Sequence, residues 1–495
     1  MKKYLKSFLV IVIGAFGTHN SAMSAGDTTL QLDLYIPSIP TSLDGLTTES
    51  YEQWTIVYNL ADRLIEYGDK SVLRPNLVKS YSLSADGREY LFEMDENRFF
   101  HNGDPVTIDD VIFSLDLSLR NKNSYSKLRD QLACLPNSKE EGCGAIKRIS
   151  STHFKVRLKE KSITFLDSLN MNENAIRSKK DHKRGKTTYS GCYVPSLISE
   201  NNLILALNDK HPNAQPQSFK TISIKPLTQN VSELLDQERG ATRSFVMINK
   251  GFPTMLSRGA KLSPSSAFQY ASGNSFLLSL KADTPQLAIV KSLIHKALFS
   301  AGSLSGFPYL KPLSAVYPEG YALGRGFNPA SIKRPLTLER PLAIKYPMNV
   351  LSSELVAHLT SLLSANGMDF KFIPVNAATY KAHLDGSQYD GMVAFPYIDI
   401  QDEARVARGY FTGYWNYFPS PKNDLLNILN EAERLTLPDE RISKMRSFYS
   451  KLLYEYPIIP LFFAPNMLLM SDDLDRRPLD YYGNTIQFSA FKRKP

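Results

Sequence analysis

Residues 342–373 read LAIKYPMNVLSSELVAHLTSLLSANGMDFKFI, and the pattern of apolar residues in this segment indicates the fold class. Residues 342–346 form a short apolar run that is typical of a buried strand. Apolar side chains then recur at helical spacing until Asn366-Gly367; they are Leu351, Leu355, Val356, Leu359, Leu362 and Leu363. Residues 370–373 return as a second strand. The order strand, helix, strand predicts a parallel βαβ unit with a right-handed crossover.

The segment that follows predicts a further strand and a candidate binding edge. Residues 391–395 are an apolar run of strand length, and residues 396–399 read PYID. In open α/β sheets, ligands bind beyond the carboxyl ends of the strands. We therefore expect Asp399 to lie at the ligand edge of this sheet.

The N-terminal half shows alternating strand and helix signals. Leucines at every second position predict a strand over residues 27–35. Apolar residues recur at helical spacing from Trp54 to Leu64 and predict a helix, with Gly68 placed as its C-cap. Residues 81–94 predict a β-hairpin with its turn at Asp86-Gly87. Thr107, followed by Asp110 three residues later, predicts the N-cap of a helix over residues 108–119.

Composition excludes several classes of protein. With 495 residues, of which 43% are hydrophobic, the chain is globular and has room for two or three packed units. The net charge of +9 is scattered, and no aromatic–basic motif indicates nucleic-acid binding. The single dense basic run, residues 177–186, is interpreted as a solvated loop, with anion binding as the open alternative.

The sequence motifs that would indicate catalysis or metal binding are incomplete or absent. The segment 185–188, GKTT, resembles the end of a phosphate-binding loop, but Lys180 stands where that loop requires glycine. The eight histidines form no HExxH pair, and no Gly-x-Ser-x-Gly elbow occurs. We expect a protein that is not an enzyme and that uses neither a metal nor a cofactor.

The N-terminus predicts export. Residues 1–25 combine three early lysines, an apolar stretch over residues 8–16 and small residues at 21–25, as in a cleavable signal peptide. The apolar stretch is too short to span a membrane, and no cysteine lies near the expected cleavage site to carry a lipid. A periplasmic location follows.

The cysteines fit that oxidising compartment. Cys134 and Cys143 flank an eight-residue loop and are candidates for a disulfide. Closing such a loop contributes roughly 2.5–3 kcal/mol on the chain-entropy model. Cys192 is left over, and we expect it to be a buried apolar residue.

A row of motifs between residues 73 and 115 carries a family resemblance. LRPNL at 73–77 and SADG at 84–87 precede FFHNGDPVTIDDVIFSL at 99–115. Their order resembles the family 5 extracellular solute-binding proteins, the oligopeptide-, dipeptide- and nickel-binding components of ABC importers. Weaker similarity continues at residues 189–193, 294–301 and 457–461.

The resemblance implies an α/β, two-lobed periplasmic binding protein fold. It is type II-like, with an extra subdomain in the first lobe, a hinge between the lobes and a ligand cleft between them. The implied boundaries place the core of the first lobe in residues 26–55, 186–248 and 466–495. The extra subdomain would comprise residues 56–185, and the second lobe residues 249–465.

The resemblance also implies the site. In peptide-binding relatives, the carboxylate at the position of Asp399 holds the N-terminal ammonium of the peptide. Tyr397, Trp415 and Asn416 are further candidate ligand contacts. Three of these have a structural alternative: Asp399 in a loop salt bridge, Trp415 in the lobe interior, and Tyr397 as a cover for the sheet edge.

The expected function is that of a monomeric periplasmic component that binds peptides and delivers them to the permease of an ABC importer in the inner membrane. Ile400 and Glu403 depart from the family's ligand loop and leave the cargo open. A nickel chelate, haem or an oligosaccharide is the alternative cargo. A periplasmic sensor or scaffold is the alternative outside transport.

Overall fold

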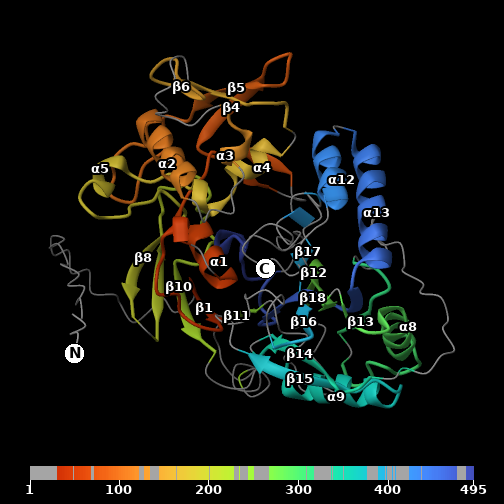
Figure 1. Ribbon diagram of the computed structural model, residues 1–495. Coiled ribbons are helices and arrows are strands. Elements are labelled where there is room, and N and C mark those ends of the chain that lie inside the picture. The colour runs from red at the N-terminus through yellow and green to blue at the C-terminus, as the bar shows by residue number, and fades with distance from the viewer. Residues whose placement is uncertain are drawn as a thin grey trace, which may run out of the picture.

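A computed structural model of the chain (Figure 1) describes residues 30–47, 50–68, 72–121, 128–133, 144–162, 164–199, 201–227, 234, 244–249, 267–281, 283–307, 309–316, 336, 338–348, 350–375, 388–395, 397–398, 404, 407–408, 423–435, 437–475 and 486–494. No helix within these ranges is both long and apolar enough to cross a membrane. The predicted signal peptide, residues 1–25, and the predicted disulfide partners Cys134 and Cys143 lie outside the described residues.

Within the described residues, one sheet of twelve strands runs through the molecule. Ten strands follow the order β15-β14-β16-β12-β18-β11-β1-β10-β9-β8, while β13 pairs with β18 and β17 with β12. The bounds are β1 (Gln31–Ile36), β8 (Tyr193–Ile198), β9 (Leu203–Leu207), β10 (Thr221–Pro226), β11 (Ser244–Asn249), β12 (Ala267–Leu280), β13 (Lys311–Pro312), β14 (Leu342–Pro347), β15 (Phe370–Val375), β16 (Gly391–Ala394), β17 (Tyr397–Ile398) and β18 (Ile458–Met470).

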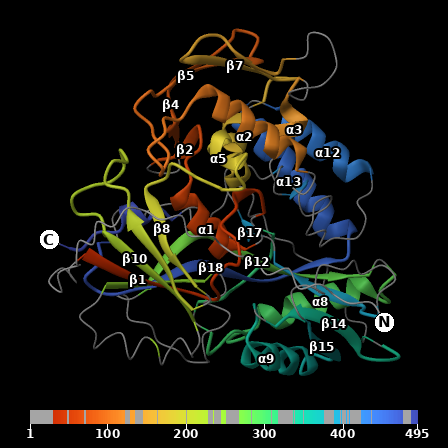
Figure 2. The same cartoon turned by 90° about the vertical axis from the view of Figure 1, so that its left-hand side faces the viewer.

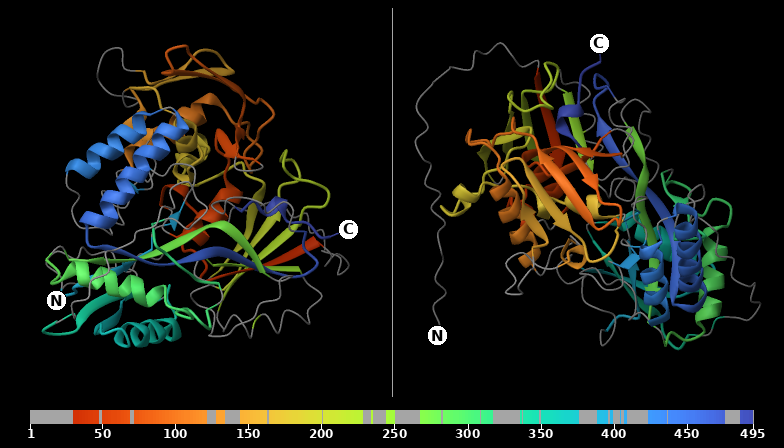
Figure 3. Two further views of the ribbon diagram at one scale, coloured as in Figure 1. Left: turned by 90° about the vertical axis from the view of Figure 1, so that its right-hand side faces the viewer. Right: turned by 90° about the horizontal axis from the view of Figure 1, so that it is seen from above.

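Two long strands join the halves of this sheet. β12 and β18 pair antiparallel from Ala267 opposite Leu469 to Ser279 opposite Ile458. β11 pairs with one end of β18, and β16 pairs with the opposite end of β12. The two strands run side by side through the lower part of the molecule (Figure 3, left). The N-terminal strands and the C-terminal βαβ unit therefore belong to one continuous ladder.

The predicted βαβ unit is confirmed. β14 and β15 pair in parallel on either side of α9 (Ser353–Ser364), and β16 pairs in parallel with β14. The hydroxyl of Ser352 caps α9, and Gly367 takes a φ of +79° after it. One face of this half of the sheet is covered by α8 (Leu287–Leu298) and α9, and the other by α12 (Asn423–Arg434) and α13 (Pro438–Glu455).

We call the part of the large sheet formed by β8, β9, β10, β1 and β11, with the segments that pack on it, the first half. A smaller antiparallel sheet stands above the first half (Figure 2). Its order is β4-β5-β7-β6, with β4 (Val78–Leu83), β5 (Glu89–Met94), β7 (His153–Arg157) and β6 (Ile146–Arg148). The predicted hairpin is confirmed as β4–β5, with Gly87 at φ +71° in its turn. The predicted capping box at Thr107 and Asp110 opens α2 (Ile108–Arg120).

Several short elements remain. They are α1 (Tyr51–Leu60), α3 (Leu128–Gln131), α4 (Phe165–Leu169), α5 (Lys179–His182), the hairpin β2 (Ile65–Tyr67) with β3 (Leu73–Pro75), and the 3-10 turns η2 (Gly45–Thr47), η4 (Asn172–Asn174) and η6 (Phe488–Ala490).

The helix predicted through Leu64 is too long by four residues, because α1 ends at Leu60. Ala61 is extended, with φ −129°, and the chain enters β2 within a few residues. Leu64 packs into the core of the four-stranded sheet, so its apolar side chain is buried by that sheet and does not extend the helix. Gly68 is not a helix cap; it lies in the β2–β3 connection, where its N–H donates to the carbonyl of Val72 over 2.8 Å.

The core of the first half is built from both ends of the chain. Leu32 and Leu34 of β1 pack in one cluster with Phe488 and Phe491. Asn59 ties α1 to the same C-terminal segment: its Nδ2 donates to the carbonyl of Ile486 over 2.8 Å, and its Oδ1 accepts from the N–H of Phe488 over 2.7 Å.

Cys192 lies in the same core and is 7% exposed. Burial raises the pKa of its thiol to about 12, with the Asp62 charge acting in the same direction. The prediction of a buried apolar cysteine is confirmed.

The basic run 177–186 is only partly the solvated loop that its charge predicts. Arg177 is 1% exposed, donates from Nη1 to Asp44 Oδ1 over 2.9 Å and lies 5.6 Å from the ring centroid of Tyr189. The residues that follow fold into the single turn α5 and leave most of their basic side chains near the surface.

Candidate functional site

The carboxyl ends of three parallel strands define the candidate ligand edge. β14 pairs in parallel with both β15 and β16, so Pro347, Val375 and Ala394 end these strands at the same edge of the sheet. This is the edge at which open α/β sheets bind ligands. Beyond Ala394 the chain turns through Phe395 toward the central strands.

β17 anchors the segment that leaves this edge. Tyr397 pairs with Asn274, and Ile398 pairs with Gly273, both in β12. At Gly273 the register between β12 and β18 shifts, and a Cβ atom there would lie 2.3 Å from the carbonyl oxygen of Ala464. Only glycine permits this close approach of the backbones.

Buried side chains fix the base of β17. Ser275 donates from Oγ to the carbonyl of Val316 over 2.5 Å. The ring of Phe276 stacks on Phe462 at 4.7 Å and on Phe395 at 6.2 Å between centroids. This packing holds the chain on both sides of the β16–β17 connection.

A buried lysine lies on the face of β14 that α12 and α13 cover. Lys345 is 1% exposed, and its Nζ lies 5.6 Å from the ring centroid of Tyr389. Burial lowers the pKa of this ammonium. It stands two residues before the carboxyl end of β14. The sequence signal for this residue is a lysine inside an otherwise apolar strand.

Asp390 has a structural role at the opposite edge. Its two carboxylate oxygens accept from Nη1 and Nη2 of Arg340, each over 2.7 Å, and Oδ2 also accepts from the N–H of Ala343. These donors, led by Arg340, lower the pKa of Asp390. The pair ties the start of β14 to the start of β16.

The predicted ligand contacts stay predictions. The backbone of Tyr397 lies in β17, whereas its side chain, together with Asp399, Trp415 and Asn416, lies outside the described residues. Among the residues that the structure describes, no group of three or more histidine, cysteine, aspartate or glutamate side chains is placed to hold a metal ion.

Comparison with known proteins gives a family match. Residues 72–291 match the model of the bacterial extracellular solute-binding proteins, family 5 Middle. The chain is 24% identical over 207 residues to the probable D,D-dipeptide-binding periplasmic protein DdpA of Escherichia coli (strain K12), a match that covers 41% of this chain and 40% of DdpA. It is 28% identical over 113 residues to the dipeptide-binding protein DppE of Bacillus subtilis (strain 168), covering 23% of this chain and 20% of DppE. These matches span less than half the length of either relative.

Solved structures are similar over nearly the whole chain. Haemophilus influenzae OppA in complex with RPPGFSPFR has a TM-score of 0.76 at 15% identity, covering 94% of this chain and 99% of that one. The periplasmic binding protein AgaA of Agrobacterium, in complex with agropinic acid, has a TM-score of 0.69 at 15% identity, covering 94% and 98%. Likeness at this identity shows the fold, and it confirms the predicted two-lobed fold of the periplasmic binding proteins.

Proposed function

Since the chain belongs to the family 5 extracellular solute-binding proteins, we propose that it binds peptides in the periplasm and delivers them to the membrane permease of an ABC importer. The observation that carries this proposal is the family match over residues 72–291, joined to a two-lobed fold that is shared over 94% of the chain with a peptide-bound structure. The two curated relatives, both named as dipeptide-binding, support a peptide as the cargo.

In the proposed mechanism, the peptide lies between the two halves of the large sheet and contacts the edge at which β14, β15 and β16 end. β12 and β18 pass from one half to the other, so they would bend or twist as the halves close on the ligand. The protein would act as a monomer and bind its cargo without changing it.

Asp399 is the proposed anchor of the peptide's N-terminal ammonium. It follows Ile398, whose backbone is held by Gly273 in the central pair of strands. A buried ammonium requires an opposite charge and hydrogen bonds, which a carboxylate provides. Tyr397, Trp415 and Asn416 are proposed to line the remainder of the site.

A non-peptide cargo is the second candidate. The likeness to AgaA in complex with agropinic acid supports it, because that complex places a small non-peptide acid in the same fold. The two candidates share the lobes and the hinge and differ in the residues that line the site.

Mass spectrometry of the gently purified protein, first native and then denatured, distinguishes them. A series of short peptides released on denaturation would establish the peptide cargo and its length range. A single non-peptide mass would favour the second candidate. If no ligand is released and peptides leave the tryptophan fluorescence of Trp54 and Trp415 unchanged, the binding function proposed here is wrong.

A further inference from the structure

A basic hollow of about 570 Å³ lies beside α5, on the outside of the first half. Figure 1 places α5 at the upper left of the molecule, away from β14, β15 and β16 in its lower part, whose ends form the candidate ligand edge. Ten residues line the hollow, and its basic members are Lys179, Lys180, Lys183 and Arg184. We refer to this site as the basic hollow.

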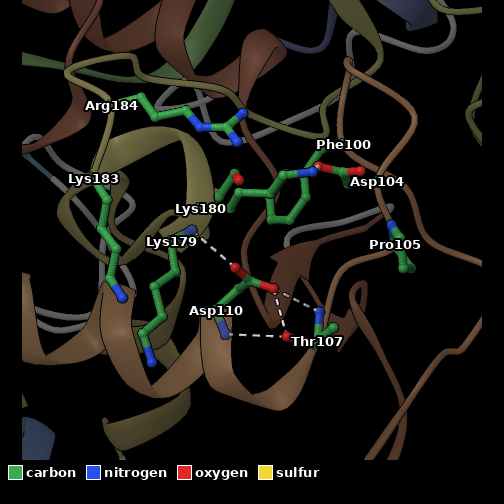
Figure 4. Close-up of a pocket in the computed structure, with 10 residues that line it drawn as sticks. Phe100, Asp104, Pro105, Thr107, Asp110, Lys179, Lys180, Lys183 and Arg184 are labelled. Atoms are coloured by element: carbon green, nitrogen blue, oxygen red, sulfur yellow. Dashed lines mark hydrogen bonds and ion pairs between the residues drawn. The ribbon is translucent and has the colours of Figure 1, made fainter.

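The two carboxylates in its lining are already engaged. Asp110 accepts at Oδ1 from the N–H of Lys179 over 2.9 Å, and at Oδ2 from the N–H and hydroxyl of Thr107 (Figure 4). Asp104 accepts at Oδ2 from Lys180 Nζ over 2.9 Å and from Asn102 Nδ2 over 3.1 Å. Neither carboxylate pairs with the ammonium of Lys179 or Lys183.

In the described part of the chain, three cations of the hollow lack a short ion pair. Within the described residues, no ion pair joins Lys179 or Lys183, and Arg184 reaches only Asp181, at 3.9 Å. That carboxylate already accepts from Asn102 Nδ2 over 2.9 Å and from Thr188 Oγ1 over 2.7 Å. Figure 4 shows the ends of Lys179 and Lys183 on the same side of the hollow, with Arg184 at another end.

Hydrogen bonds hold the backbone that carries these cations. The bond from the Lys179 N–H to Asp110 ties α5 to the first turn of α2, and Ser178 Oγ accepts from the N–H of Asp181. Phe100 is buried in the core of the four-stranded sheet and forms part of the wall. The backbone beneath the basic groups is thus tied to α2 and to the wall of the hollow.

We propose that the basic hollow binds a phosphate-bearing group, separately from the peptide site. Lysine and arginine form short, charge-assisted hydrogen bonds with phosphate oxygens, and several cations around one hollow suit an anion with more than one charged oxygen. The group belongs either to a free phosphorylated solute or to the headgroup of an anionic phospholipid.

The test compares the full-length protein with the variant Lys179→Ala/Lys183→Ala/Arg184→Ala. The matched control is Lys210→Ala/Lys296→Ala/Lys371→Ala, which removes the same charge from exposed lysines elsewhere. The probes are inorganic phosphate, followed by calorimetry at constant ionic strength, and sedimentation with vesicles of phosphatidylglycerol mixed with phosphatidylcholine. Circular dichroism checks that both variants fold.

We expect the wild type and the control to bind phosphate, and the first variant to bind it about tenfold more weakly or worse. Phosphate binding without vesicle binding identifies a free solute as the source. Vesicle binding that phosphate displaces, and that phosphatidylcholine alone does not support, identifies the lipid headgroup. The proposal is overturned if the wild type binds neither probe, or if the control loses as much binding as the first variant. Peptide binding is measured separately, so its failure would count against the proposed function and leave this site untouched.

Discussion

Arg98 donates from Nη2 to Oδ2 of Asp62 over 2.7 Å, and both side chains are buried. Arg98 Nη1 also donates to the carbonyl of Asn76 over 2.9 Å, and Nε2 of His211 lies 3.3 Å from each carboxylate oxygen of Asp62. These residues come from the end of α1, the four-stranded sheet region and the loop before β10. The pair therefore joins the smaller sheet to the core of the first half.

Replacing Asp62 is expected to destabilise the protein strongly. Asp62→Asn leaves Arg98 buried without its counter-charge, which typically costs about 3–5 kcal/mol. Urea unfolding at neutral pH measures the loss. Asp209→Asn is the control, because Asp209 makes an exposed pair with Lys220 and its removal should cost little. Equal stability of the two variants would contradict a structural role for the buried pair.

The same pair predicts loss of stability in acid. Burial alone would raise the pKa of Asp62, but the charges of His211 and Arg98 and their hydrogen bonds outweigh it and hold the pKa far below its usual 3.8. A carboxyl group with a depressed pKa contributes its stability in full above the usual value and loses it as the pH falls toward the folded-state pKa. The free energy of unfolding should fall below about pH 4, and it should fall less steeply in Asp62→Asn.

Replacing Asp399 is expected to weaken peptide binding without affecting the fold. Loss of one partner from a buried charge pair in a binding site typically costs about 2–5 kcal/mol of binding free energy. Calorimetry with the peptides identified by mass spectrometry measures Asp399→Ala against Asp283→Ala, which removes an exposed acid elsewhere in the chain. Unchanged affinity in Asp399→Ala would show that another group holds the peptide.

A side chain at Gly273 should disturb the central pair of strands. In Gly273→Ala the new Cβ atom would lie 2.3 Å from the Ala464 carbonyl oxygen, so the backbones must separate. Forced overpacking of this kind typically costs about 1–3 kcal/mol. Thermal unfolding compares it with Gly144→Ala, where no heavy atom lies within 4 Å of the new Cβ. A melting temperature equal to that of the control would mean that the strands adjust freely.

Thiol counting tests the cysteines. Cys192 is buried and the pKa of its thiol is raised to about 12, so a thiol reagent should not label it in the native protein. If Cys134 and Cys143 form a disulfide, denaturant without reductant should expose one thiol, and reduction should expose three. Three thiols before reduction would show that the predicted disulfide is absent.

Local signals predicted the parts of the fold that local chemistry determines. The β4–β5 hairpin, the capping box at Thr107 and the βαβ unit each depend on turn, cap or periodicity signals within about 30 residues. The pairing of β12 with β18 joins residues that are 179 to 202 positions apart, and the largely apolar sequence of β18 does not indicate which strand it pairs with.

The candidate site was predicted from strand edges and from the family motif, which together select Asp399. Arg98 and Asp62 were missed because a buried ion pair leaves no local pattern: each residue is an ordinary charge in its own segment. Leu64 was assigned to α1 because an apolar side chain at helical spacing looks the same whether its partner is the helix or a different layer.

The packing of β1 against Phe488 and Phe491 limits how early during synthesis the first half can fold. Synthesis proceeds from the N-terminus, so Leu32 is made more than 450 residues before Phe488 and Phe491, which complete this core. The first half therefore cannot complete its core until Phe491 has been synthesised, and before that point the nascent chain lacks part of this packing. Such a delay suits a protein proposed to pass through a membrane before it folds.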